Sequence, residues 1–516
     1  MNAEEEGRPA PVVEPSAGWS RRHFLQSLGA AAAVAAVWPT TVDAAPRRAA
    51  LPRNPRIAIV GGGMAGLNAA YQLKKRGIAS TVYESRSRVG GRMFTVRDTF
   101  GTGSVTDVGA ELVNSNHAEM IGLAQDFGIG LFDRLADAAA TGIPSTVYLV
   151  DGQVRAEADV ASAFRELARR IGRDAAKLYS QPDRYTSVFD NLSAKAYLDQ
   201  NADAIPAPWV RELIEETVRT EYGVEPEGAS SLVFLYNLPT VNGKEVELLA
   251  GSDEQFLVEG GSGAITDAVA AHLGAAVRTG HSCRSISETD EGYRLAFSNG
   301  VTIIADILIC ALPWPVLRRL DVSVPFPAEF GRFIEEVELG ANEKVVAGFS
   351  DRFWRTQGRF ANEFWSTEEF ASGWDASQRA SATGGGALTF FTGGDGALAA
   401  LRGSVGQKAV EYVSTLSSYY PEAGARYTRK ALRSGWLTDP NTLGAYANFA
   451  PGQTTRFAAY TWYEDPAGPE SRQEVRFGNA YFIGEQTSSE FYGFMNGAAE
   501  TGRLAAESVL RRLGAI

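Results

Sequence analysis

The hydrophobic pattern near residue 57 predicts a strand that leads directly into a helix. Residues 57–60 (IAIV) are apolar throughout, as expected of a strand buried on both faces of a parallel sheet. Residues 64–76 continue with apolar positions at helical spacing, and Gly77 ends that helix. Residues 80–84 (STVYE) then predict a second strand. The pattern therefore indicates a β-α-β unit at the start of the folded part of the chain.

The middle of the chain changes from helical periodicity to strand periodicity. The helical segments are 118–128, 160–172 and 209–223. Residues 256–274 predict a strand, a glycine turn and a helix. Residues 293–300 end in a hairpin turn at Asn299–Gly300, and residues 302–313 are apolar enough to form a central strand. We therefore expect a mixed α/β protein.

Composition narrows the class of protein. A chain of 516 residues with 45% hydrophobic and 21% charged residues predicts a soluble globular protein of two or more domains. The net charge of −12 gives no reason to expect nucleic acid as a partner, because a nucleic-acid-binding protein needs a basic face. Only four histidines and two cysteines occur, without zinc-like spacing, so no metal site is expected.

The two cysteines, Cys283 and Cys310, both fall in predicted strands. An oxidising compartment would permit a disulfide between them, whereas neighbouring buried strands could equally hold two free thiols. We favour the free thiols.

The first 44 residues differ from the rest of the chain. Adjacent arginines in SRRHFLQ (20–26) precede an apolar stretch at 28–38, and VDA (42–44) offers small residues for cleavage. This segment resembles a twin-arginine export signal. Its eleven apolar residues are too few to span about 30 Å of hydrocarbon. We therefore expect residues 1–44 to be a signal peptide, with the export machinery as a partner and a periplasmic or secreted mature protein.

Glycines at the first strand–helix junction indicate a nucleotide site. Gly61, Gly63 and Gly66 follow the spacing G-x-G-x-x-G, which permits a tight turn, close approach of a pyrophosphate and close helix packing. The helix start offers free N–H groups and a positive dipole end to phosphates. Glu84, about 20 residues further on, suits a ribose hydroxyl and disfavours a 2′-phosphate. An ordinary β-α-β unit with a surface glutamate is the alternative.

A second glycine pair narrows the nucleotide to a flavin. SRSRVGGRMFT (85–95) places Arg92 just after the ribose contact, and DVGAE (107–111) follows. Together these motifs resemble the flavin amine oxidase family, which includes monoamine oxidases, polyamine oxidases and L-amino acid oxidases. The resemblance extends from about Pro55 to Leu513.

This resemblance implies the fold and its domains. We expect an α/β fold with a discontinuous Rossmann-like FAD-binding domain of the GR2 type, and a mixed-sheet substrate domain with a helical subregion. The FAD-binding domain would comprise residues 55–133, 256–322 and 455–516. The substrate-binding domain would comprise residues 134–255 and 323–454.

The resemblance also implies a set of residues that bind FAD. They lie in the glycine turn, after the second strand, in the two motifs above and in the C-terminal motif. The set is Gly61, Gly63, Met64, Ala65, Gly66, Glu84, Ser85, Arg86, Gly91, Arg92, Gly109, Ala110, Glu111, Leu112, Cys283, Trp436, Gly484, Glu485, Gly493, Phe494 and Met495. Ala445 stands where monoamine oxidases carry the cysteine that bonds to the flavin, so FAD should be bound non-covalently.

Four residues would carry catalysis. Lys344 in EKVV matches the family lysine that holds a water at flavin N5, although taken alone it could be a solvated strand residue. Tyr446 and Phe494 match the two walls of an aromatic cage over the flavin, where Phe494 lacks the hydroxyl of monoamine oxidases. Trp436 resembles a tryptophan that lines the flavin. The reaction would be hydride transfer from an amine to flavin N5, followed by hydrolysis of the imine.

The substrate class is less well defined by the sequence. Amino acid oxidases of the family carry an arginine at the position of Leu112, so its absence favours an amine without an α-carboxylate. Polyamine oxidases carry an acidic residue where Asn114 falls, and Glu111 could attract a cation or only hydrogen-bond within its loop. The alternative is an L-amino acid oxidase or dehydrogenase that uses another arginine. The candidates are Arg352, Arg355 and Arg359.

Two other functions are considered on the same sequence. A protoporphyrinogen-type oxidase is disfavoured by Lys344 and Tyr446. The other is a flavin-binding electron carrier without turnover, whose flavin absorbance would not be bleached by substrate. The electron acceptor is O2, giving H2O2, or another acceptor. Dimers are common in the family, so the resemblance leaves a homodimer open.

Overall fold

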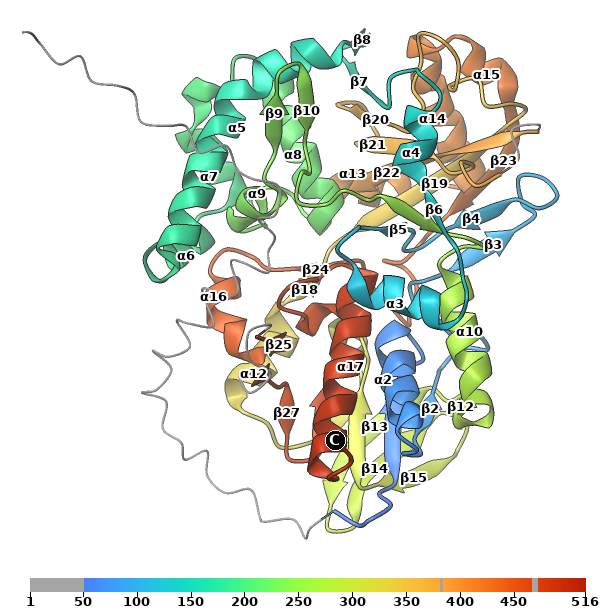
Figure 1. The fold of residues 1–516 in the computed structure, drawn as a ribbon, viewed down its shortest axis with the longest axis vertical. Helices are drawn as coiled ribbons and strands as arrows, with labels where there is room; N and C mark the ends of the chain where they lie inside the picture. The colour runs from blue at the N-terminus through green and yellow to red at the C-terminus, as the bar shows by residue number, and fades with distance from the viewer. Residues whose placement is uncertain (1–50, 381–383, 466–471) are drawn as a thin grey trace, which may run out of the picture.

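The computed structural model describes residues 51–380, 384–465 and 472–516, so the predicted export signal at 1–44 lies outside the described residues. Figure 1 shows a nucleotide-binding region that contains both ends of the described chain, a region built on a large sheet, and a helical region beside it. This arrangement confirms the expected mixed α/β fold class.

The nucleotide-binding region is built on a six-stranded sheet of order β12-β2-β1-β16-β28-β27. The first five strands are parallel and β27 is antiparallel to β28. Their bounds are β1 Ile57–Val60, β2 Thr81–Tyr83, β12 Val277–Arg278, β16 Ile307–Cys310, β27 Arg476–Phe477 and β28 Ala480–Phe482. All four residues of β1 are buried, as predicted from its uninterrupted apolar run. Three separate stretches of the chain thus share one sheet, while the exact domain boundaries stay a prediction.

Three helices pack on this sheet: α2 (Met64–Lys75), α10 (Gly263–Leu273) and α17 (Met495–Arg512). The first and the last lie side by side (Figure 1). Gly502 allows this close packing, because a Cβ there would lie 2.3 Å from the carbonyl oxygen of Ala65. The C-terminal helix therefore packs against the first turn of α2, the helix that follows the glycine turn.

The apolar run at 302–313 is divided between two sheets rather than forming one central strand. Residues Thr302–Ala305 form β15, antiparallel to β14 (Gly292–Phe297), and only Ile307–Cys310 enter the parallel sheet. Asp306 separates the two strands, and its carboxylate lies 2.7 Å from the guanidinium of Arg56. Asp306, an ion-paired residue, thus lies where the chain passes from one sheet to the other.

The sheet of order β15-β14-β13-β17 also contains β13 (Cys283–Thr289) and β17 (Asp321–Ser323). Cys283 and Cys310 are both free thiols, as expected. Burial raises the pKa of each thiol to about 12, so neither is a thiolate at neutral pH.

The second large sheet has the order β23-β19-β22-β21-β20-β7-β8 and is antiparallel except for the pair β20–β7. Its strands are β7 Thr146–Val150, β8 Gln153–Arg155, β19 Asn342–Phe349, β20 Glu363–Ser366, β21 Ser372–Asp375, β22 Gly386–Gly393 and β23 Tyr427–Arg433. Every residue of β19 and β22 is buried. The helices beside it are α13 Gly394–Ala400, α14 Val405–Tyr419 and α15 Glu422–Arg426.

The helical region comprises α5 Glu157–Ser180, α6 Pro182–Asp190, α7 Ala194–Gln200, α8 Pro208–Tyr222 and α9 Leu232–Asn237. The predicted helices at 160–172 and 209–223 lie in α5 and α8. The latter contacts β19, β20 and β22, so its C-terminal end meets the large sheet. Gly223 ends it in the left-handed conformation at φ 67°.

Short elements join these regions. A three-stranded sheet has the order β5-β11-β6, and the hairpin strands β3 and β4 lie next to it in Figure 1. The remaining elements used below are β3 Thr95–Arg97, β4 Val105–Asp107, β5 Leu112–Val113, α3 Ala118–Asp126, β6 Leu131–Asp133, α4 Arg134–Ala139 and β11 Phe256–Val258. Within the described ranges, no helix combines the length and the apolar character needed to cross a membrane.

Candidate active site

Two adjoining cavities lie where the nucleotide-binding region meets the large sheet. The larger, with an empty volume of about 1330 Å³, runs from the carboxyl end of β1 to Trp436 and Tyr446. The smaller, with an empty volume of about 900 Å³, lies beside α8, β20 and β21. We call them the cofactor cavity and the substrate cavity. Both are lined by Gly109, Ala110, Lys344, Phe391, Tyr446, Gly493, Phe494 and Met495.

The glycine turn forms one end of the cofactor cavity. Gly61 has φ 109°, and a Cβ there would lie 2.7 Å from the carbonyl oxygen of Ala311. A Cβ on Gly63 would meet no atom within 4 Å, so this face is open to a ligand. Helix α2 starts here without a side-chain cap and without an acidic residue in its first turn. Its first N–H groups and its positive dipole end therefore suit a pyrophosphate.

Glu84 lies at the end of β2 on the same cavity. Its carboxylate accepts hydrogen bonds from the backbone N–H of Gly62 (2.7 Å) and of Arg86 (2.8 Å). His281 and Cys283 line the cavity beside it. A fixed carboxylate at the end of the second strand, beside the glycine turn, is the arrangement that suits a ribose hydroxyl.

Most residues predicted to bind the cofactor line this cavity. They are Gly61, Gly63, Met64, Ala65, Glu84, Ser85, Arg86, Gly91, Arg92, Gly109, Ala110, Cys283, Trp436, Gly484, Glu485, Gly493, Phe494 and Met495. Three do not. Gly66 serves helix packing, because a Cβ there would lie 2.1 Å from the carbonyl oxygen of Gly61. Glu111 and Leu112 line the substrate cavity instead, because the chain turns away after Ala110.

Ion pairs hold the walls of the cofactor cavity together. Arg86 lies 2.6 Å from Asp439 in the loop that follows β23, and Arg92 lies 2.9 Å from Glu485. Both arginines are thus anchored from the opposite wall. They supply permanent positive charge along the cavity while remaining fixed in position.

Lys344 lies on β19 at the junction of the two cavities and is only 6% exposed. Its ammonium donates to Glu111 Oε2 at 2.7 Å and to the carbonyl oxygen of Asp107 at 3.4 Å. It also lies 4.9 Å from the ring centroid of Trp374. The lysine is therefore a buried, paired cation and not a solvated strand residue.

Aromatic side chains surround this junction. Tyr446 and Phe494 both line both cavities, and Trp436 lines the cofactor cavity. Burial raises the pKa of Tyr446, so its phenol is neutral at any physiological pH. The ring of Phe494 packs edge-on against His117 at 5.2 Å. The predicted cage residues thus meet at one place, together with Phe391 of β22.

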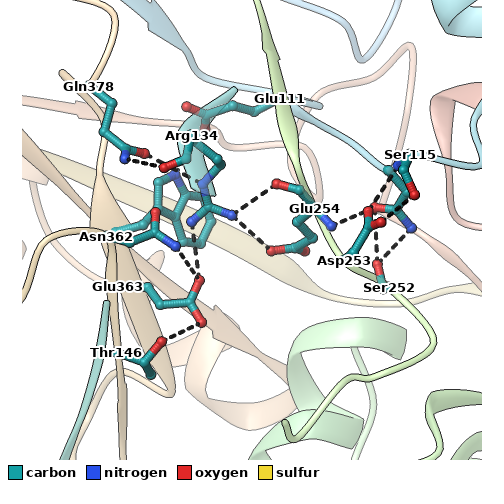
Figure 2. A network of polar contacts seen from close by, with 12 residues as sticks. Glu111, Ser115, Arg134, Thr146, Ser252, Asp253, Glu254, Asn362, Glu363 and Gln378 are labelled. Atoms are coloured by element: carbon teal, nitrogen blue, oxygen red, sulfur yellow. Dashed lines mark hydrogen bonds and ion pairs between the residues drawn. The ribbon is translucent and has the colours of Figure 1, made fainter. Parts of the chain in front are cut away.

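Four carboxylates line the substrate cavity: Glu111, Glu221, Glu254 and Glu363. Arg134, which is 1% exposed, lies behind two of them. Its guanidinium is 3.5 Å from Glu254 Oε2 and 3.1 Å from Glu363 Oε2, and Figure 2 shows the two glutamates approaching it together. Thr146 and Asn362 also donate to Glu363 at 3.4 Å each.

Glu254 is held in an unusual backbone conformation, with φ 47°. Its backbone N–H donates to the side-chain oxygen of Asn114 at 3.1 Å, which ties its loop to the residue that follows β5. Burial raises the pKa of its carboxyl to about 8, against the opposing effect of Arg134. The carboxyl of Glu254 therefore loses its proton as the pH rises through the neutral to mildly alkaline range.

The arginines considered for a substrate carboxylate do not line the substrate cavity. Arg352 and Arg355 lie 3.8 Å and 4.0 Å from Asp375, and Arg355 is also 2.8 Å from Asp137. Arg359 lies 3.0 Å from Glu422. Arg134 is the buried arginine beside the cavity, and it is already paired with two glutamates.

Comparison with known proteins shows which family the chain belongs to. The family model "Flavin containing amine oxidoreductase" matches residues 64–510. The chain belongs to the flavin-containing amine oxidoreductase family. It is 24% identical to an amine oxidase [flavin-containing] of Oncorhynchus mykiss over 493 residues, covering 89% of this chain and 86% of that protein. It is 25% identical to amine oxidase [flavin-containing] B of Sus scrofa over 484 residues, covering 89% and 87% of the two chains.

Solved structures with the same fold include two amine oxidases. Putrescine oxidase bound to putrescine has a TM-score of 0.72 and 21% identity, covering 89% of this chain and 99% of that one. Cyclohexylamine oxidase from Brevibacterium oxydans IH-35A has a TM-score of 0.73 and 19% identity, covering 89% and 100%.

Membership of the flavin amine oxidases makes this chain an oxidoreductase that uses FAD. The cofactor cavity fits that group along its length, from the glycine turn past Glu84 to Trp436 and Tyr446. Ala445 lines the same cavity and has no sulfur with which to form a thioether, in keeping with non-covalent FAD.

Sequence reasoning did not find Glu221, Glu254, Glu363, Trp374 or Arg134. They come from α8, the loop before β11, two strands of the large sheet and the start of α4. No motif joins them, because only the tertiary fold brings them together. The unusual φ of Glu254 leaves no signal in the sequence.

Proposed function

We propose that this flavin amine oxidase acts on amines that lack an α-carboxylate. The observation that carries the proposal is the charge of the substrate cavity, where four glutamates face one region and the nearby buried arginine is paired with two of them. A substrate carboxylate would meet like charges and no free arginine fork. An amine cation would be attracted to the same site.

The residues of the chain then act by orientation and exclusion of water. The chemistry that bound FAD would supply is acceptance of a hydride from the carbon next to the amine nitrogen, and the imine would then be hydrolysed to a carbonyl compound. Tyr446 and Phe494 present aromatic faces on which an amine can rest before it loses its proton. The neutral phenol of Tyr446 gives up no proton of its own. We propose O2 as the electron acceptor, with H2O2 as product.

A second cationic group on the substrate would fit the far side of the cavity. Glu254 and Glu363 share the single charge of Arg134, so ionisation of both leaves a surplus of negative charge there. Diamines such as putrescine are therefore the favoured substrates within the amine class. The fold shared with putrescine oxidase is in keeping with this choice.

The test is anaerobic bleaching of the flavin absorbance by matched pairs of compounds. Putrescine and cadaverine are compared with ornithine and lysine, and phenethylamine with phenylalanine. We expect bleaching by the amines, with the diamines effective at the lowest concentrations. Bleaching by the amino acids alone would show that the chain is an L-amino acid oxidase or dehydrogenase, and no bleaching by any compound would favour an electron carrier.

We also propose export of the folded protein by the twin-arginine route. The support is the sequence of residues 20–44 alone. Replacing Arg21 and Arg22 with lysine should leave the protein in the cytoplasm, as measured by fractionation. Undiminished export of that variant would reject the proposal.

A further inference from the structure

Glu111 is buried beside Lys344 and does not line the cofactor cavity. It is 4% exposed, lines the substrate cavity and follows directly after Gly109 and Ala110, which line both cavities. One carboxylate oxygen, Oε2, accepts from the ammonium of Lys344 at 2.7 Å and from the indole N–H of Trp374 at 3.2 Å. The carboxylate thus meets the lysine from the substrate side.

A second ion pair stands behind this one. Arg379 lies 3.0 Å from the carboxylate of Asp107 and 3.9 Å from Glu111 Oε1. Asp107 is 1% exposed and also accepts from the backbone N–H of Ser262 at 2.9 Å and the hydroxyl of Thr95 at 2.5 Å. These bonds fix Asp107, and through Arg379 they limit where the carboxylate of Glu111 can lie.

The four charges alternate in sign from Lys344 through Glu111 and Arg379 to Asp107. A buried ammonium is costly without an anion, and the other two carboxylates near Lys344 have partners of their own: Asp107 pairs with Arg379, and Glu254 pairs with Arg134. Removal of the Glu111 carboxylate would leave two cations facing each other across a cavity wall. We expect the ammonium of Lys344 then to move away from the junction.

We propose that Glu111 is a positioning residue that holds the ammonium of Lys344 at the junction of the cofactor and substrate cavities. The two hydrogen bonds of the lysine use two of its three N–H bonds, which leaves one N–H for a ligand in the cavities. The inference rests on the proposed function only in that Lys344 faces both FAD and an amine. It gives Glu111, the third residue of the motif GAE, a role beyond forming part of the wall of the substrate cavity.

The first test measures Lys344 without any substrate. The chain has eight lysines, so ¹³C labelling at lysine Cε gives few NMR signals, and Lys344→Met identifies the one from Lys344. In Glu111→Gln we expect the chemical shift of that signal to change and its line to broaden, because the ammonium has lost its partner at 2.7 Å. An unchanged chemical shift and line width would overturn the proposal.

The second test separates a positioning role from attraction of the substrate. Glu111→Gln should lower the limiting rate of anaerobic flavin reduction or of reoxidation at least tenfold, with a smaller effect on KM. In the Lys344→Met background the same change should have little further effect, because coupled residues are not additive. Equal effects with and without Lys344 would mean that Glu111 acts independently of the lysine.

Glu363→Gln is the matched control. It removes another carboxylate from the same cavity, but this carboxylate pairs with Arg134 and not with Lys344. We expect it to raise KM for cationic substrates while leaving the Lys344 signal in place. Glu111→Asp keeps the charge on a shorter side chain and should recover part of the limiting rate. Because the NMR measurement needs no substrate, its failure can be distinguished from a wrong choice of substrate class.

Discussion

At the scale of single residues, Lys344 shows how burial changes the meaning of a side chain. From sequence alone, a lysine near the start of a strand is expected to be exposed to solvent. Only the resemblance to the flavin amine oxidase family predicts a role for Lys344 at the flavin. The structure encloses it between Glu111, Trp374 and two cavities. Its position was therefore predictable from the motif, whereas its partners were not.

Replacement of Lys344 by methionine should retain FAD and abolish most turnover. Methionine keeps the length of the side chain but removes the ammonium, so the cavities keep their shape. We expect FAD content near that of the wild type and a loss of kcat by about 10² or more, the scale set by one preorganised polar group. Visible spectra and steady-state oxygen consumption give the two values. Turnover at the wild-type rate would show that the lysine is only structural.

Glu254 predicts a pH dependence of substrate binding. Its pKa is raised to about 8, so the carboxyl is mostly protonated at pH 7 and ionises as pH rises through 8. KM for a diamine should therefore fall between pH 7 and pH 9, as long as the distal ammonium stays charged. The fall should be absent in Glu254→Gln. A monoamine of similar size is the control substrate, and a parallel fall in its KM would contradict the assignment.

At the scale of elements, the sequence pattern located most strands and helices of the nucleotide-binding region. The glycine spacing and the apolar run of β1 depend only on residues close together in the sequence, so the strand and the turn can be predicted from the sequence. The run at 302–313 could not be divided correctly, because the choice between two sheets depends on the partner strands β14 and β1. The substrate cavity could not be predicted for the same reason, since α8, β20 and the loop before β11 contribute one glutamate each.

Gly66 gives a test of how β1 and α2 pack. A Cβ at Gly66 would overlap the carbonyl oxygen of Gly61 at 2.1 Å, which would push the helix start away from the glycine turn. Gly66→Ala should cost about 1–3 kcal/mol of stability, as other overpacked sites do, and should weaken FAD binding. Thermal unfolding and the flavin content after gel filtration measure the two effects.

Gly122 in α3 is the matched control for this substitution. It is also a helical glycine, but a Cβ there would meet no atom within 4 Å. Gly122→Ala should therefore stabilise the protein by about 0.5–1 kcal/mol and leave the flavin content unchanged. Similar losses in both variants would show that the contact at Gly61 is not the cause.

At the scale of the whole molecule, buried carboxyls set how stability depends on pH. Burial raises the pKa of Glu500 on α17 to about 8 and that of Glu216 on α8 to about 7. The folded state therefore holds these protons above the pH at which an unfolded chain releases them. Between pH 5 and pH 8 the unfolded state binds fewer protons, so these groups make the free energy of unfolding fall as pH rises.

Glu500→Gln should reduce this loss of stability. Glutamine cannot ionise and can still accept the hydrogen bond that Ser488 donates to Glu500 at 2.8 Å. We expect Tm of the variant to exceed that of the wild type at pH 8.5 and to differ little at pH 5, a gain of about 1–3 kcal/mol at the higher pH. An equal difference at both pH values would show that ionisation is not involved.

Helix α17 carries a consequence for the timing of synthesis. It lines the cofactor cavity through Met495 and packs against α2, yet it is made after every other helix and strand described. A ribosome that has already completed the glycine turn must still translate most of the chain before the pocket closes. Because the cavity lacks one wall until α17 has been made, only a fully translated chain can form the complete cofactor cavity.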